Sequence, residues 1–450
     1  MESNRRSDGA VAAELRASER MITLDDLPVA RTEIELSAPP VELDLLNAGP
    51  QTGKIFALVR LHTHPLGVVV LDAADGCAWQ THAPTVRSAM REPINAHLAA
   101  DGLPCVDELD LLSKGSQRTP VCVSRREAIM ADAPAITVII GTRERAENLR
   151  RCLDELLQLE YPCFEIVVVD NDPVTTDTAN LIADHYSSKV RYVREDRRGL
   201  SSAHNRGLEE ASTEIVAFVD DDVIVDKHWL TGIAEGFAAD ADVGCVTGLI
   251  LPAELDTPAQ LLLQRHGGYD KGFELRVFDT KHNRPDDPLF PFTAGRLGSG
   301  ANMAFNTEVL RSLGGFDRAM GIGTFARGGD DLVAFFRVVL RHQLVYQPAA
   351  AVWHRHHRDM AALQNQAVCY GVGFGAFLTS ALVHEPAMWT DLMRRLPAGL
   401  AYAFSPVSAR NRFRYDGLPT DMARREKLGL LSGPPAYVIS RWRARRAVST

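Results

Sequence analysis

The chain has 450 residues, which is too long for one ordinary domain and predicts two or three folded units. Apolar residues make up 46% of it and charged residues 24%, as is typical of a globular protein with a sizeable buried core. The formal net charge of −9 argues against nucleic acid as the main partner.

The C-terminal part of the chain has the opposite charge. From about Ala387 onward it is rich in arginine and contains few acids. Such a basic tail predicts contact with an anionic surface, and the alternative is a solvated polar segment. The arginines of this tail are Arg394, Arg395, Arg410, Arg412, Arg414, Arg424, Arg425, Arg441, Arg443, Arg445 and Arg446.

The seven cysteines are scattered along the chain, and no two form a CxxC pair or another close cluster. This spacing predicts neither a disulfide framework nor a zinc site, and it favours a reducing cytoplasm. The N-terminal sequence MESNRRSDGA is charged and lacks an apolar segment, so we expect no secretory signal. We also expect no transmembrane helix, because no run of about 18 uncharged apolar residues stands out.

Residues 1–130 form the first predicted unit, an accessory α/β region whose chemistry the sequence does not indicate. Its end falls near the linker SKGSQRTP, residues 113–120. A helical pattern covers residues 88–102. The β-like runs of this unit are residues 30–36, 54–62 and 65–72.

The second predicted unit, residues 134–360, alternates Val- and Ile-rich runs with segments of helical periodicity. This alternation predicts an α/β domain with a mostly parallel sheet that is covered by helices on both faces. Ligands bind beyond the carboxyl ends of such strands, where Asp170 and Asp220 are expected. The strand-like runs are residues 135–140, 164–170, 190–196 and 214–222.

The third predicted unit, residues 361–450, begins as a helical region and becomes basic and irregular. Its segment 370–383 is apolar but interrupted by glycines. A packed core helix is favoured there over an interfacial one, because no charged face accompanies the apolar residues.

The strongest chemical signal is the run of three acids, Asp220, Asp221 and Asp222, directly after IVAFV. Adjacent carboxylates repel one another, and a bound Mn²⁺ or Mg²⁺ would relieve that repulsion. The cation would then bridge a diphosphate and stabilise it as a leaving group. The alternative is a solvated acidic turn.

Two other polar positions follow apolar runs. Asp170 ends VVVD and either binds a nucleobase or ribose or caps the next helix. His354 is the first histidine after LVYQPAAAV and is a candidate cation ligand, although histidine-rich runs also occur in ordinary surface loops.

Asp330 and Asp331 follow the glycine-rich GTFARGG and precede an apolar helical pattern. One of them could deprotonate an acceptor hydroxyl, and acids also favour helix N-termini for electrostatic reasons alone. A second loop of small residues, GSGANMAF, could line a sugar pocket. The candidate pocket residues in it are Gly298, Ser299, Gly300 and Asn302.

Taken in order, eight elements resemble the inverting glycosyltransferases of family 2, which have the GT-A fold. They extend from about Ala135 to His357, roughly half of the chain. The resemblance implies a Rossmann-like, mostly parallel sheet with helices on both faces, here joined to a small N-terminal α/β unit and a helical, basic C-terminal region. The eight elements are VIIGTRER, EIVVVDN, RRGLSSAHNRGL, IVAFVDDDV, GSGANMAF, GGFD, RGGDDLVAFFR and VWHRHH.

The resemblance also implies which residues bind the nucleotide. Thr142 and Arg143 would lie against the base, and Asp170 would hydrogen-bond it. Asn205 would help to shape the nucleotide site.

Further residues are implied to bind the metal and to carry the catalysis. Asp220 and Asp222 would be the outer acids of the DxD motif, with Asp220 near the ribose and Asp222 on the metal. His354 matches a position that ligates the metal in some members. Asp331 would be the general base. The family's Glu-Asp pair is Asp-Asp here, so Asp330 stays a rival for that role.

The implied reaction is a single displacement with inversion at the sugar. The donor would be a nucleotide-sugar, with UDP favoured and GDP and dTDP open, and the acceptor a glycan, a lipid-linked compound or a small molecule. The Arg-rich tail would allow peripheral contact with the inner face of a membrane. One alternative is a sugar-phosphate nucleotidyltransferase, although the loop GTRER lacks the repeated glycines of that class. The other is a non-catalytic nucleotide- or carbohydrate-binding protein, although the expected acids are all present.

Overall fold

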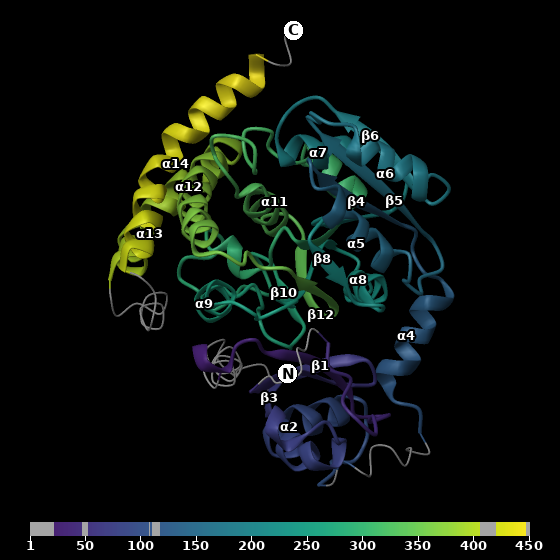
Figure 1. Ribbon diagram of the computed structural model, residues 1–450. Coiled ribbons are helices and arrows are strands. Elements are labelled where there is room, and N and C mark those ends of the chain that lie inside the picture. The colour runs from purple at the N-terminus through teal and green to yellow at the C-terminus, as the bar shows by residue number, and fades with distance from the viewer. Residues whose placement is uncertain (1–21, 47–52, 108, 110–117, 406–419, 447–450) are drawn as a thin grey trace.

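The computed structural model describes residues 22–46, 53–107, 109, 118–405 and 420–446. A large sheet with helices on both sides forms the centre of the molecule (Figure 1). A small N-terminal unit lies at one end of it, and the C-terminal helices run along one side. The predicted fold class, an α/β domain with accessory units, is confirmed.

The first half of the large sheet alternates strands and helices in the predicted way. β4 pairs in parallel with both β5 and β7, and β5 pairs in parallel with β6, so their carboxyl ends lie at one edge. The elements in chain order are β4 (Ile136–Thr142), α5 (Ala146–Leu156), β5 (Phe164–Asn171), α6 (Asp177–His185), β6 (Val190–Glu195), α7 (Leu200–Glu210) and β7 (Ile215–Val219).

The second half extends this sheet with strands of both directions. The full order is β10-β12-β9-β11-β7-β4-β5-β6, and β8 pairs with β12 outside this path. The elements are β8 (Val223–Val225), α8 (Trp229–Phe237), β9 (Val243–Pro252), α9 (Pro258–Gly267), β10 (Arg276–Phe278), the 3₁₀ turn η3 (Ala294–Arg296), β11 (Asn302–Asn306), α10 (Thr307–Ser312), α11 (Asp330–Val339) and β12 (Gln343–His354).

The strands are apolar throughout because both faces of the sheet are buried. In β4, Ile139 packs into one core cluster, whereas Val138 and Ile140 pack into the cluster on the opposite face. Helix α5 places Leu149 and Leu153 on the second of these faces at helical spacing. The alternation of strands and helices is therefore the pattern that the sequence predicts.

The N-terminal unit is a second, three-stranded sheet with one long helix. β1 runs parallel to β2, and β2 runs antiparallel to β3. The helix α4 follows and leads to the large sheet. The elements are η1 (Leu24–Asp26), β1 (Ala30–Glu35), β2 (Lys54–Leu61), β3 (His64–Asp72), η2 (Ala73–Asp75), α2 (Trp79–Ala100) and α4 (Val121–Ala131).

The N-terminal unit shares a hydrophobic core with the large sheet. Alternate residues of β2 face α2, whereas Phe56 and Leu58 pack in one cluster with Leu251 of β9 and Trp353 of β12. A buried ion pair between Arg60 and Asp226 also joins the two parts, at 2.5 Å. The N-terminal unit therefore packs against β12, the strand that ends at His354.

The C-terminal helices are α12 (Met360–His384), η4 (Pro386–Met388), α13 (Trp389–Phe404) and α14 (Thr420–Arg446). α12 and α14 pack backbone against backbone: a Cβ added at Gly371 would lie 2.0 Å from Glu426 O, and one at Gly433 would lie 2.5 Å from Ala376 N. The glycines that interrupt the apolar segment 370–383 thus permit close helix packing. Arg410, Arg412 and Arg414 of the predicted basic tail lie outside the described residues.

α12 also bears on the expectation of no transmembrane helix. Among the described residues it is the one helix long and apolar enough to cross a membrane by length and composition, whereas the sequence led us to expect none. Half of its most apolar window is buried inside the structure, where it packs against α14 and α11. Core helices pass the same test, so the finding is weak evidence for a membrane span.

Candidate functional site

The three consecutive acids lie at the carboxyl edge of the parallel strands. Asp220 directly follows β7, and Thr142, the last residue of the neighbouring β4, donates a hydrogen bond from its hydroxyl to Asp221 Oδ2 at 2.7 Å. Thr142 is in turn the register partner of Asp170 on β5. Parallel strands bring their carboxyl ends to one edge, which is why three segments far apart in sequence meet here.

Asp220, Asp222 and His354 form one group of possible metal ligands. One ligand atom from each lies within 4.8 Å of the others. The antiparallel pairing of Val223 with His354 explains this proximity, and it leaves His354 Nε2 3.4 Å from Asp222 Oδ1. That buried oxygen has no hydrogen-bond partner in the structure. The oxygen and nitrogen donors fit Mn²⁺ or Mg²⁺, and the orphaned oxygen is where a cation would be expected.

The electrostatics of this group also fit a cation. Burial, followed by the charges of Asp222 and Asp221, raises the pKa of Asp220 well above its usual value. Burial lowers the pKa of His354, which favours the neutral imidazole that a metal requires. An excess of negative charge next to a neutral histidine is the environment that a divalent cation would neutralise.

Arg145 supplies part of the compensating charge, and sequence reasoning missed it. Its guanidinium lies 2.6 Å from Asp221 Oδ1 and 2.7 Å from Asp222 Oδ2. Burial raises the pKa of Asp222, but the neighbouring His354 ring and the charge of Arg145 outweigh this and lower it overall. The signal was present, because Arg145 closes the loop GTRER after the first strand of the sheet.

The two candidate bases lie at the start of α11 in different surroundings. Asp331 Oδ2 accepts the backbone N–H of Gly300 at 2.9 Å, so the predicted small-residue loop directly contacts it. Burial, then the charge of Asp330, raises the pKa of Asp331 to about 6. Asp330 is itself buried, with Oδ2 3.6 Å from His204 Nδ1. The loop leaves little room for a side chain at Gly300, since a Cβ there would lie 3.2 Å from Asp331 Cβ.

Two of the predicted nucleotide-binding residues keep polar atoms for a ligand. Asp170 is buried, and its Oδ2 accepts a hydrogen bond from the Tyr192 hydroxyl at 3.0 Å, whereas its Oδ1 has no partner. Burial raises the pKa of Asp170. Arg143 is partly exposed and pairs with Asp172 at 3.3 Å. Both residues lie at the edge of the sheet that carries the acids, and their nucleotide contacts stay a prediction.

Two other predicted site residues have side chains that serve the fold. Both polar atoms of Asn205 bond the backbone of Phe316, each at 2.8 Å, so they hold the GGFD loop against α7. The amide of Asn302 donates to the carbonyls of Leu249 and Ala350 and accepts from Trp229 Nε1. Asn302 is 1% exposed, and its place in a donor or acceptor pocket stays a prediction. Gly298 faces Thr247 in the same interior region, and Ser299 is half-buried.

A tyrosine pair beside the candidate metal group was also missed. The Tyr269 and Tyr370 hydroxyls lie 2.6 Å apart, and Gln366 donates to both. The ring of Tyr269 lies next to that of His354, with centroids 5.3 Å apart. Tyr370 and Gln366 come from α12, so the C-terminal region contributes to the site. Nothing in the spacing of these residues signals that they meet.

Residues 137–312 match the profile described as Glycosyl transferase family 2. This part of the chain belongs to glycosyltransferase family 2.

Curated relatives of the family 2 domain include the pre-mycofactocin glycosyltransferase of Mycobacterium tuberculosis, which is 26% identical over 227 residues. That match covers 50% of this chain and 43% of the relative, so the chain spans less than half of its length. Glycosyltransferase AglE of Haloferax volcanii is 32% identical over 101 residues, 22% of this chain and 33% of that protein. A solved structure, the mannosyltransferase PcManGT from Pyrobaculum calidifontis in complex with GDP-Man and Mn²⁺, superposes with a TM-score of 0.41 at 18% identity, covering 67% of this chain and 87% of that one.

Proposed function

We propose that this protein is an inverting glycosyltransferase of the hexosyltransferase type. It moves a sugar from a nucleotide-sugar, with UDP favoured, to a hydroxyl of a glycan, a lipid-linked compound or a small molecule. The observation that carries the proposal is the group formed by Asp220, Asp222 and His354 at the carboxyl edge of the family 2 sheet. An unpartnered oxygen of Asp170 at the same edge supports a nucleotide site there.

In this proposal Asp222 and His354, with Asp220 beside them, hold Mn²⁺ or Mg²⁺. When bound, the cation supplies the positive charge that stabilises the departing nucleoside diphosphate. Asp331 takes the proton from the acceptor hydroxyl as its oxygen attacks the anomeric carbon. A pKa of about 6 suits this role, because the carboxylate is ionised at neutral pH yet is basic enough to accept a proton. The backbone N–H of Gly300 orients that carboxylate.

The proposal is tested by release of nucleoside diphosphate from UDP-, GDP- and dTDP-sugars with and without Mn²⁺, using the whole chain. We expect slow, metal-dependent hydrolysis of one donor class that disappears in Asp222→Ala and in Asp331→Asn. If hydrolysis requires the acceptor, calorimetry should still detect metal-dependent binding of the donor. Asp222→Ala should lose this binding, and Asp331→Asn should keep it. If no nucleotide-sugar shows metal-dependent turnover or binding, the proposal fails.

The same assay separates the two alternatives. A sugar-phosphate nucleotidyltransferase would release pyrophosphate from a nucleoside triphosphate and a sugar 1-phosphate. A non-catalytic binding protein would bind a nucleotide-sugar and would keep its function in cells after Asp331→Asn. The retained acids at all the predicted positions favour the transferase over both.

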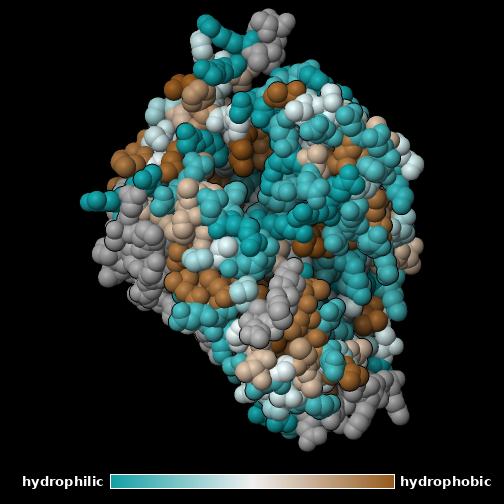
Figure 2. Space-filling model, in the orientation of Figure 1, coloured by the Kyte–Doolittle hydropathy of each residue, from teal (hydrophilic) through white to brown (hydrophobic). Residues whose placement is uncertain are grey.

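We further propose that the protein is cytoplasmic and docks peripherally on an anionic membrane leaflet through α13 and α14. Both helices expose large apolar side chains, each between 43% and 67% exposed, and brown patches appear over α14 in Figure 2. Arginines flank them, including Arg394 on α13 and Arg443 on α14. Apolar and cationic side chains on one helix suit an interface with anionic lipid. The exposed apolar residues are Trp389, Met393, Leu396, Leu400, Leu428, Leu431, Val438, Ile439 and Trp442.

Sedimentation of the whole chain with vesicles tests this docking. We expect binding to vesicles that contain anionic lipid and about tenfold weaker binding after Leu428→Ser with Leu431→Ser. Val174→Ser is the matched control, because Val174 is an exposed apolar residue far from these helices in the sequence. Substitutions are preferable to deletion, since α14 covers α12. Equal sedimentation of the double variant and the parent would contradict the proposal.

A further inference from the structure

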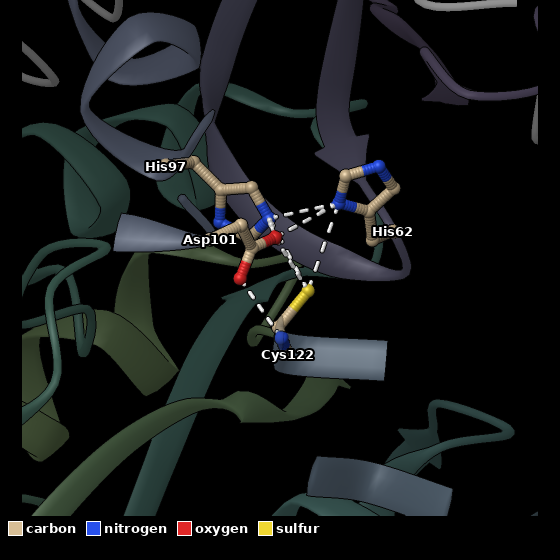
Figure 3. Close-up of side chains that lie close together, drawn as sticks. All are labelled: His62, His97, Asp101 and Cys122. Carbon is tan, nitrogen blue, oxygen red and sulfur yellow. Dashed lines mark hydrogen bonds and ion pairs between the residues drawn. The ribbon is translucent and has the colours of Figure 1, made fainter. Parts of the chain in front are cut away.

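A second group of metal-binding side chains lies in the N-terminal unit, away from the acids of the family 2 domain. It consists of His62, His97, Asp101 and Cys122, and their side chains converge on one point (Figure 3). Asp101 is buried and the other three are partly buried. These residue types are the nitrogen, oxygen and sulfur donors that zinc prefers.

Three separate elements bring the four residues together. His97 and Asp101 are four residues apart at the end of α2 and so project from the same face. Cys122 is the second residue of α4, and its backbone N–H donates to Asp101 Oδ1 at 2.8 Å, which orients that carboxylate. His62 lies in the two-residue turn between β2 and β3, where His62 and Thr63 both have the positive φ that such a hairpin turn requires.

The distances between the donor atoms approach those of a tetrahedron. His62 Nδ1 lies 3.2 Å from both His97 Nε2 and Asp101 Oδ2, and the latter two are 3.3 Å apart. Cys122 Sγ lies 3.6 Å from each histidine nitrogen. Tetrahedral zinc with ordinary bond lengths would separate nitrogen and oxygen donors by about 3.3–3.4 Å, and sulfur from nitrogen by about 3.6 Å.

One of the six distances departs from this geometry. Cys122 Sγ lies 2.8 Å from Asp101 Oδ2, as a thiol that donates a hydrogen bond to a carboxylate. Zinc would replace that proton, and the two atoms would separate to about 3.6 Å. The required movement is confined to one pair of side chains.

The same residues do not form a nucleophile with a catalytic base. In such an arrangement the acid binds the histidine nitrogen opposite the one that faces the nucleophile. Here Asp101 Oδ2 and Cys122 Sγ approach the same nitrogen of His97, Nε2. Convergence of all four donors on one point is the geometry of a metal site.

We infer that His62, His97, Asp101 and Cys122 bind one structural Zn²⁺. Four protein ligands fill a tetrahedral site, so the ion has no open position for chemistry. Two anionic ligands, the Asp101 carboxylate and the Cys122 thiolate, neutralise its charge. The spacing of the cysteines predicted no zinc site because only one cysteine takes part and its partners lie on other elements.

The zinc ion would fasten α4 to the N-terminal unit. On the next turn of α4, Arg126 forms a salt bridge with Glu235 of α8 at 2.6 Å, and Glu235 also faces His64 of β3. The ion therefore stabilises the connection between the N-terminal unit and the family 2 domain. This role is independent of the proposed glycosyl transfer and of its Mn²⁺ or Mg²⁺.

Metal analysis of the whole purified protein tests the inference. We expect about one zinc per chain after gel filtration, retained in Asp222→Ala and in the control Cys105→Ser, whose thiol is exposed. Cys122→Ser and His97→Ala should lose most of the zinc. Chelation should lower the melting temperature of the parent protein and leave that of Cys122→Ser unchanged.

Cobalt gives a second measurement that needs no folded variant. Titration of the chelated parent protein with Co²⁺ should produce intense tetrahedral absorption bands and a thiolate-to-cobalt band, and Zn²⁺ should bleach both. If the parent protein contains no zinc and neither Zn²⁺ nor Co²⁺ binds it with these signals, the inference is overturned. Zinc that Cys122→Ser retains in full would overturn it as well.

Discussion

Arg145 forms a two-pronged ion pair with the acidic run: one guanidinium nitrogen lies 2.7 Å from Asp222 Oδ2 and the other 2.6 Å from Asp221. It occupies one side of the carboxylates, and the oxygen of Asp222 that faces His354 is left without a hydrogen bond. Arg145 and a metal ion can therefore both neutralise the negative charge of these carboxylates. Arg145 stabilises the acids in the absence of metal, and a cation completes the neutralisation.

The first prediction follows from this sharing. Arg145→Ala should lower the free energy of unfolding by about 1–2 kcal/mol without divalent cation, a figure reduced because the arginine is 44% exposed. Mn²⁺ should then raise the melting temperature of the variant more than that of the parent protein. Thermal unfolding with and without Mn²⁺ measures both. Arg151→Ala is the control, since Arg151 pairs with Glu147 on the surface of α5. Equal Mn²⁺ effects on the variant and the parent would contradict the prediction.

The second prediction concerns the pH dependence of the proposed transfer. Asp331 must be ionised to accept a proton, and its pKa is raised to about 6 by burial and then by Asp330. kcat/KM should therefore rise with pH up to about 6 and then level off. The pH profile of donor turnover at saturating metal is the measurement.

Asp330→Asn separates the two candidate bases in the same assay. If Asp331 is the base, removing the charge of Asp330 should move the midpoint of the profile to lower pH while turnover persists. If Asp330 is the base, the variant should lose turnover at every pH. In Asp331→Asn, turnover should be lost at every pH if Asp331 is the base, and it should persist if Asp330 is the base.

The third prediction concerns Asp317, which links the GGFD loop to the C-terminal helices. Its carboxylate accepts hydrogen bonds from Ser380 and His384 on α12 and from Tyr437 on α14. Burial raises the pKa of Asp317, but the hydrogen bonds from His384 and Ser380 outweigh this and bring it to about 2.

A lowered carboxyl pKa stabilises the fold above the unfolded-state value of 3.8, and that stability is lost as the pH falls toward 2. The shift corresponds to about 2 kcal/mol at neutral pH. Asp317→Asn should lose about this much and should show a smaller further loss between pH 4 and pH 2, measured by denaturant unfolding. Asp196→Asn, at an exposed ion pair with Arg194, should match the parent protein. An unchanged acid transition in Asp317→Asn would refute the assignment.

The fourth prediction distinguishes a structural Asn302 from a pocket residue. Asn302→Ala would leave two buried carbonyl groups and the Trp229 indole N–H without partners. We expect a loss of about 3–5 kcal/mol in the free energy of unfolding. Ser299→Ala, three residues earlier in the loop that precedes β11, should cost less than about 1 kcal/mol. A stable Asn302→Ala with altered donor preference would instead support the pocket role that the motif implied.

The sequence by itself determined the family 2 sheet and the acids at its edge. Runs such as AITVII and FEIVVVD encode strands that are buried on both faces, because alternate side chains of a strand point to opposite sides. The position of Asp220 after IVAFV then follows from chain order, since a residue that ends a parallel strand must lie at the carboxyl edge. These are local relationships, and periodicity and adjacency are enough to read them.

Only the tertiary structure decided which distant residues meet. Asn205 and Asn302 match the family motif in sequence, yet their amides are used by Phe316 and by strands β9 and β12. The burial of β2 against Trp353, and the convergence of His62, His97, Asp101 and Cys122, join segments that no sequence period relates. Side-chain partners across such separations depend on how whole elements pack. A single sequence records the apolar surfaces that drive that packing but not the contacts that result from it.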